Sequence, residues 1–132
     1  MSTRCRIAYF DGDAYRSVYC HHDGYVEGVG ATLIEHYPTL EDAKALVSLG
    51  DFSSLMDSFE ETSKTAYSNR GETCPPLISY SLIGLISQTY NCDGEFLYIL
   101  RDGKWRVFDV YGFDEYCEET FLDYVEDKLK ED

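Results

Sequence analysis

The chain has 132 residues, with 25 acidic and 11 basic side chains, a formal net charge of −14 and 44% hydrophobic residues. This length suits one domain spanning residues 1–132, and so much apolar material excludes a disordered chain. A negative field repels nucleic-acid phosphates and anionic lipids, so we expect no direct nucleic acid and no membrane among its partners. Basic protein surfaces are the favoured partners.

The N-terminal segment predicts a β-hairpin. Residues Cys5–Phe10 and Tyr15–Cys20 are rich in aromatic and β-branched side chains and flank Asp11-Gly12-Asp13. Asp-Gly supplies the positive φ that a tight turn requires. No apolar leader precedes the hairpin, and the five cysteines are odd in number and form no Cys-x-x-Cys pair. We therefore expect reduced thiols and a cytoplasmic protein.

Two helices are predicted to follow. Apolar residues recur at helical spacing from Val29 to Tyr37, and Pro38 would end that helix. Thr39, with Asp42 three residues later, resembles a capping box that opens a helix ending at Gly50.

The middle of the chain is harder to assign. Residues 60–76 lose all periodicity and predict a long loop. The next segment, residues 77–90, is ambiguous. The spacing of Ile78 and Tyr80 is typical of a strand, whereas the spacing of Leu85 and Ile86 is typical of a helix. We favour a helix from about Ser81 to Tyr90.

The C-terminal third predicts a second hairpin and a last helix. Phe96–Leu100 and Trp105–Tyr111 flank an Asp-Gly turn, and Asp114–Lys130 is amphipathic. The resulting fold class is α+β, an antiparallel sheet built from two β-hairpins with three to four helices packed on one face.

Side chains able to bind a ligand gather in the segment Cys20–Gly30. One hypothesis is a ligand site formed by His21, His22, Asp23 and Tyr25 of this loop, together with His36 further along the chain. Neighbouring side chains of an extended segment project oppositely, so adjacent histidines do not converge on one metal, and we predict no metal site. No oxyanion-hole motif or phosphate-binding glycine pattern accompanies them, so we predict no catalytic residues and no cofactor. The plainer interpretation is a structural turn braced by His36.

Acidic residues form the second candidate site, which is a surface for binding a partner. Carboxylates spaced along helices can imitate the phosphate track of DNA and occupy a DNA-binding groove. The predicted partner-binding residues are Glu41, Asp42, Asp57, Glu60, Glu61, Asp114, Glu115, Glu118, Glu119, Asp123, Glu126 and Asp127. The alternative interpretation is an ordinary solvated surface that keeps the protein in solution.

Three patterns carry a family resemblance. They are Tyr-x-His-x-Asp-Gly-Tyr at residues 19–25, Leu-x-x-His-Tyr at residues 33–37 and Leu-Gly-Asp-x-Ser-Ser-Leu at residues 49–55. With the Thr-Arg-Cys opening and a Lys-Trp hairpin, they resemble a loose group of small phage and prophage accessory proteins of unsettled function. The resemblance covers roughly the first 55 residues and, weakly, the final hairpin.

The resemblance implies that the protein is a phage or prophage accessory protein, and it assigns no catalytic residue. Such proteins work in the bacterial host cytosol and often bind host machinery, including restriction and CRISPR complexes. We therefore expect a non-enzymatic protein that binds a host protein through an acidic, DNA-mimicking surface, with a nucleic-acid-binding complex as the candidate partner. Two alternatives stay open: a nucleotide or metal site in the Cys20–Gly30 loop, and a homodimeric structural protein.

Overall fold

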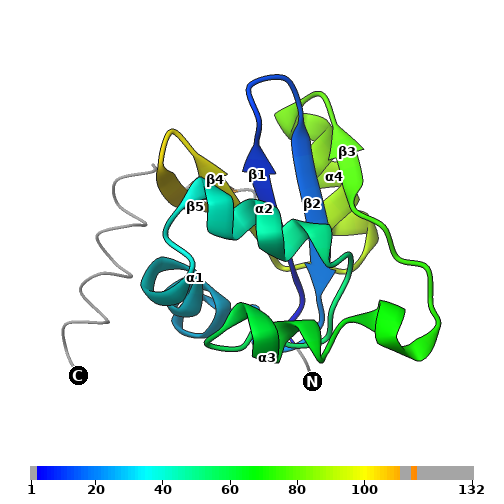
Figure 1. Ribbon diagram of the computed structural model, residues 1–132. Helices are drawn as coiled ribbons and strands as arrows, with labels where there is room; N and C mark the ends of the chain where they lie inside the picture. Colours follow the sequence, from blue (N-terminus) through cyan, green and yellow to red (C-terminus); the bar gives the residue numbers. More distant parts are fainter. Residues whose placement is uncertain (1–2, 111–113, 116–132) are drawn as a thin grey trace.

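A computed structural model describes residues 3–110 and 114–115 (Figure 1). The fold is α+β, with strands in the order β3-β2-β1-β4-β5-β6 across one sheet. The strands are β1 (Cys5–Phe10), β2 (Tyr15–Cys20), β3 (Leu77–Ser79), β4 (Phe96–Arg101), β5 (Lys104–Asp109) and β6 (Asp114–Glu115). The helices are α1 (Ala31–His36), α2 (Leu40–Ser48), α3 (Phe59–Ser63) and α4 (Leu82–Asn91), with a π-helical turn, η1 (Val26–Gly30), and a 3-10 turn, η2 (Tyr67–Arg70).

The sheet is mixed, so the prediction of a purely antiparallel sheet is wrong. β1 pairs with β2 and β4 pairs with β5 in antiparallel fashion, but β1 and β4 run parallel, with Cys5 opposite Phe96. β3 adds an outer strand beside β2. A parallel pair needs a long crossover, and the chain between β2 and β4 provides one that carries all four α-helices of the described residues.

Helices cover both faces of the sheet, which corrects the prediction of a single covered face. On the first face, Ile7, Val18 and Trp105 pack with Leu33 of α1 and Leu46 of α2. On the second face, Ala8, Leu97 and Ile99 form a separate cluster with Leu85 of α4. Figure 1 shows α2 in front of β1 and β2, with α4 behind them. Central strands that are buried on both faces have continuous runs of apolar residues, and β4 is an example.

The helix starts agree with their capping residues. Thr39 accepts a hydrogen bond from the Asp42 N–H, and the Asp42 carboxylate accepts one from the Thr39 N–H, so the capping box is confirmed. The Ser81 hydroxyl caps α4 by accepting a hydrogen bond from the Gly84 N–H, and the predicted helix over Ser81–Tyr90 is confirmed. The helix predicted over Val29–Tyr37 begins three residues earlier, as the π-helical turn η1.

The long loop predicted over residues 60–76 is wrong in part, because it contains most of α3 and all of η2. The Ser58 hydroxyl caps α3 by accepting from the Glu61 N–H. Thr62 of α3 is fully buried and accepts a hydrogen bond from the Met56 N–H. Five helical residues are too few to display a helical period, which is why the sequence conceals this element.

The C-terminal helix predicted over Asp114–Lys130 does not begin at Asp114. Asp114 and Glu115 form β6, whose backbone pairs with Asp109 and Phe108 of β5. Residues 116–130 of that prediction lie outside the described residues. In the part of the chain that is described, no helix has the length and apolar character needed to cross a membrane.

Candidate functional site

The loop after β2 holds its histidines by contacts within the protein. The Tyr19 hydroxyl lies 2.6 Å from His21 Nδ1, and the rings of His21 and His22 meet edge to face with centroids 4.6 Å apart. Burial lowers the pKa of His21, and the nearby His22 and Arg4 lower it further. His21 is therefore neutral at pH 7 and serves as a hydrogen-bonding partner of Tyr19.

The Asp23-Gly24 turn is fixed to the sheet by its backbone. The Gly24 N–H donates to the Thr3 carbonyl at 2.8 Å, and the Tyr98 hydroxyl donates to the Gly24 carbonyl at 2.7 Å. A Cβ atom on Gly24 would lie 2.8 Å from the Thr3 oxygen, so no larger residue fits without a shift of backbone. Asp23 has a φ of 59°, and its backbone carbonyl accepts a hydrogen bond from the Val29 N–H. These contacts account for the turn without a ligand.

His36 is not brought to this loop, contrary to the prediction that it braces the turn. Its Nε2 atom lies 3.8 Å from a Glu35 oxygen and 3.7 Å from an Asp57 oxygen. His36 ends α1, and that position directs it to the segment before α3. Across residues 3–110, no group of three or more His, Cys, Asp or Glu side chains is placed to hold a metal ion. A ligand site at His21, His22, Asp23 and Tyr25 stays a prediction.

Tyr37 is the centre of a buried hydrogen-bond network beside His36. Its hydroxyl donates to the Met56 carbonyl at 2.8 Å and lies 3.0 Å from Thr62 Oγ1. Its own carbonyl accepts from Trp105 Nε1 at 2.8 Å. Burial raises the pKa of Tyr37, and the charges of Asp57 and Asp42 raise it further. The network therefore joins α1, α3 and β5, and it places both carboxylates near one phenol.

Five of the predicted partner-binding acids lie at the start of α2 and in the segment that leads into α3. Asp42 lies in the first turn of α2 beside Glu41, and Asp57 precedes α3, whose first turn contains Glu60 and Glu61. The side chain of Asp57 is 84% exposed. We call this surface the acidic face, and its acids are Glu41, Asp42, Asp57, Glu60 and Glu61.

Exposed apolar side chains interrupt the acidic face. Met56 and Phe59 are 40% and 44% exposed, and Leu40, at the start of α2, is 38% exposed. The exposure of Met56 and Phe59 is not predicted from the sequence. The available signal was their position next to Asp57 and Glu60, because apolar residues among acids at a helix start are poorly placed to reach a core.

The remaining predicted partner-binding acids belong to the C-terminal segment. Asp114 and Glu115 lie in β6, at the β5 edge of the sheet. The others lie outside the described residues: Glu118, Glu119, Asp123, Glu126 and Asp127.

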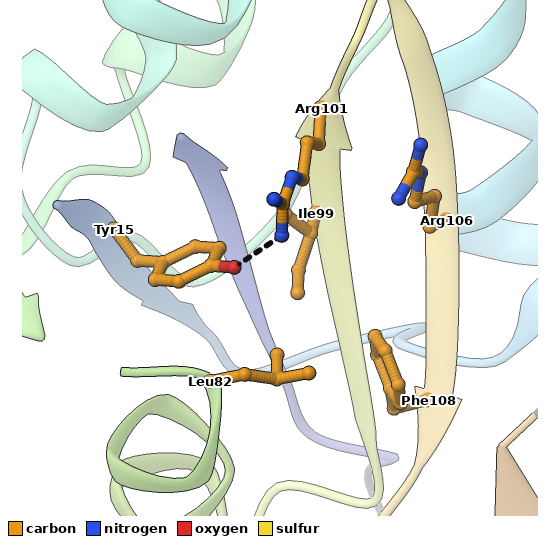
Figure 2. A pocket seen from close by; sticks show the side chains of 6 residues that line it. All are labelled: Tyr15, Leu82, Ile99, Arg101, Arg106 and Phe108. Atoms are coloured by element: carbon orange, nitrogen blue, oxygen red, sulfur yellow. Dashed lines mark hydrogen bonds between the residues drawn. The ribbon is translucent and has the colours of Figure 1, made fainter. Parts of the chain in front are cut away.

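A small hollow opens on the second face of the sheet. It has a volume of about 40 Å³. Its lining consists of Tyr15, Leu82, Ile99, Arg101, Arg106 and Phe108. Figure 2 shows Tyr15 and Arg101 joined by a hydrogen bond, with Arg106 across from them on the neighbouring strand.

Basic residues cluster in two stretches of the sequence, Arg4 with Arg6 and Arg101 with Lys104 and Arg106, and the structure places the two stretches differently. Arg6 is 2% exposed and donates to the Ser17 hydroxyl and carbonyl, so the Arg4–Arg6 stretch offers no basic surface strip. Arg101 and Arg106 instead share the lining of the hollow.

Comparison of the chain with protein-family models, with curated proteins and with solved structures finds no match. The acidic face and the hollow are therefore interpreted from their own chemistry.

Proposed function

We propose that the protein is a non-enzymatic binder of a host protein and that its acidic face docks on a basic surface of that partner. The observation that carries this proposal is the exposure of Met56, Asp57 and Phe59 in one short segment at the start of α3. Carboxylates steer a cationic partner, and the apolar side chains supply area that is buried on contact.

The charges of the acidic face support long-range attraction. Among the described residues, no lysine or arginine lies within 4.0 Å of Glu41, Asp57 or Glu60, and Lys64 contacts Glu61 at 3.1 Å. The Nε2 atom of His36 lies 3.7 Å from an Asp57 oxygen. A face with so little internal neutralisation keeps its negative potential, which attracts a basic protein over about one Debye length, roughly 10 Å at 0.1 M salt.

The exposed apolar side chains would supply the binding affinity for the partner. Electrostatic complementarity mainly raises the association rate, whereas methionine and aromatic side chains buried at the centre of an interface supply most of the binding energy. Met56 and Phe59 come from a segment held by hydrogen bonds from Tyr37 and to Thr62, so little conformational entropy is lost when they are covered.

The class of partner follows from the resemblance and the charge together. Phage accessory proteins often act on restriction or CRISPR complexes, whose nucleic-acid grooves are basic. An acidic surface that occupies such a groove would inhibit the complex by competing with DNA, which requires no chemistry from the protein. Inhibition of a host defence complex is therefore our specific proposal.

A homodimer is the second candidate, and one observation favours it. Residues 73–92 contain no charged side chain, and within them Tyr80 and Ile83 are 77% and 78% exposed. Two copies of a strongly negative chain can approach most readily through an uncharged surface. Sedimentation equilibrium on the wild type and on Ile83→Glu separates the two candidates, because only a dimer through this surface dissociates in the variant.

The main proposal is tested by capture from bacterial lysate at low and high salt, with double-stranded DNA as an eluting competitor. The test variant carries Glu41→Gln, Asp57→Asn and Glu60→Gln. The matched control carries Asp13→Asn, Glu72→Gln and Asp93→Asn, which removes the same charge from exposed positions elsewhere. We expect a captured protein that DNA displaces, that high salt releases and that only the acidic-face variant fails to retain. Equal loss in both variants, or capture indifferent to salt, would refute the acidic face as the docking surface.

A further inference from the structure

The second face of the sheet carries a cluster of positive charge that the proposed function does not use. In the β4–β5 register, Arg101 lies opposite Lys104 and Ile99 lies opposite Arg106. Residues two apart on a strand share a face, so Arg101, Lys104 and Arg106 all belong to the second face. The turn between the strands contributes one carboxylate, Asp102, which leaves a surplus of two positive charges in a strongly acidic protein.

Arg101 is held in position by two aromatic residues. Its guanidinium lies over the Phe10 ring, with Cζ 4.8 Å from the ring centroid. Its Nη1 donates a hydrogen bond to the Tyr15 hydroxyl at 2.7 Å. A guanidinium has five N–H donors in one plane, so stacking and a single hydrogen bond fix that plane and leave further donors for another acceptor.

Arg106 faces the same hollow from β5. Its side chain is 14% exposed, and its Nη2 lies 3.3 Å from an Asp102 oxygen. The same carboxylate lies 4.0 Å from Arg101 Nε. One exposed carboxylate therefore stands between two guanidinium groups, and its long distances to both leave room for competition by a second anion.

The hollow limits the size of a bound group. A volume of about 40 Å³ can hold one compact group but not a nucleoside. Leu82, Ile99 and Phe108 form its apolar walls, which exclude water and strengthen charge interactions at the open side. The rest of a ligand would therefore extend outward over the surface.

We propose that this hollow binds the terminal phosphate group of a small phosphomonoester. A phosphate monoester carries about 1.5 to 2 negative charges at pH 7, which complements the net charge of +2 that Arg101, Asp102, Lys104 and Arg106 carry together. Planar guanidinium groups bind phosphate oxygens in bidentate fashion, and the Tyr15 hydroxyl can serve as an additional donor. The site is independent of the acidic face, because it lies on the opposite face of the sheet.

A purely structural role predicts different behaviour. Arginine stems often cover apolar surface while the charged ends remain in water, and Arg101 and Arg106 would then merely shield Ile99 and Phe108. In that case, phosphate would affect these side chains no more than any other salt does.

Side-chain NMR distinguishes the two roles. The Nε–Hε signals of all arginines are followed while inorganic phosphate, phenyl phosphate or sodium chloride of equal ionic strength is added. We expect saturable shifts for Arg101 and Arg106 with both phosphates but not with chloride, and tighter binding of phenyl phosphate than of inorganic phosphate. Arg70 provides the internal reference, because it also stacks on an aromatic ring, Tyr67, and pairs with a carboxylate, Glu72.

Variants complete the test. We expect Arg101→Gln and Arg106→Gln each to weaken phenyl phosphate binding at least about tenfold, the size expected for loss of one charged hydrogen-bonding group. Arg70→Gln should leave binding unchanged. Tyr15→Phe preserves the ring and tests the hydroxyl alone, with an expected loss of several-fold.

Three results would overturn the proposal. They are chloride shifts equal to the phosphate shifts, an equal loss of binding in Arg70→Gln, and tighter binding of a phosphodiester oligonucleotide than of the monoester. The last would indicate a nucleic-acid backbone as the ligand of the hollow.

Discussion

The indole of Trp105 donates a hydrogen bond to the backbone carbonyl of Tyr37, with Nε1 and O 2.8 Å apart and both residues buried. This bond links β5 to the end of α1. The Tyr37 hydroxyl continues the link to Met56. These two bonds are one of the links between the sheet and the segment that presents the acidic face.

We expect Trp105→Phe to lower the free energy of unfolding by about 1–3 kcal/mol, because the buried Tyr37 carbonyl loses its donor. Loss of ring volume adds to this cost. Urea denaturation followed by far-UV circular dichroism measures the change. An unchanged midpoint would mean that water replaces the indole and that the bond does not anchor the segment.

The charge of Asp11 gives a second prediction. Hydrogen bonds from the Ala14 and Asp13 N–H groups, together with Arg16, lower the pKa of this carboxyl from 3.8 to about 2. Because the folded state holds the carboxylate more strongly than the unfolded state does, the associated stability is present above pH 3.8 and is lost as pH falls toward 2. We expect Asp11→Asn to be less stable than the wild type at pH 7 and the difference to vanish near pH 2.

The measurement for Asp11 is a series of thermal melts between pH 7 and pH 2. Asp13→Asn is the matched control, because this neighbour is exposed and shares the turn. A stability difference that persists unchanged at pH 2 would show that the carboxylate charge is not responsible.

The close fit of Gly24 gives a third prediction. A Cβ atom at this position would meet the Thr3 oxygen at 2.8 Å and backbone or Cβ atoms of Arg4 and Cys5 at 3.0 Å. We expect Gly24→Ala to cost about 1–3 kcal/mol, the range for overpacking against atoms that cannot move independently. Tyr98→Phe, which removes the donor to the Gly24 carbonyl, should cost about 1 kcal/mol in the same urea experiment. A neutral Gly24→Ala would indicate that the turn moves freely and is open to a ligand role.

Local patterns predicted the local structure well. The capping box of Thr39 and Asp42 and the start of α4 at Ser81 depend on residues within a few positions of one another. The spans of β1 and β2 also match prediction, because the Asp11–Asp13 turn is a local feature. Such elements are specified by their own residues and not by tertiary contacts.

Features that depend on distant residues could not be predicted. Arg6 alternates with core residues and suggests an exposed strand face, yet α4 covers the second face and leaves Arg6 buried against Ser17. The parallel pairing of β1 and β4 has no local signature. His36 contacts Asp57 and not the loop at His21, because the fold and not the motif decides which segment meets the end of α1.

The apolar part of the acidic face gives the last prediction. Met56 and Phe59 are 40% and 44% exposed, so replacing both with serine should change the free energy of unfolding by no more than about 0.5 kcal/mol for each substitution. If these side chains are covered by a partner, the double variant should lose at least about tenfold in affinity for the captured protein, since buried anchor residues commonly contribute more than 1.4 kcal/mol each.

The matched control is Tyr80→Ser with Ile83→Ser, which removes side chains that are 77% and 78% exposed on the uncharged segment. Surface plasmon resonance should show a faster dissociation rate for the Met56 and Phe59 variant, with little change in the association rate, because charge and not apolar area governs encounter. Loss confined to the Tyr80 and Ile83 control would instead assign binding to the uncharged segment and refute the acidic face as the interface.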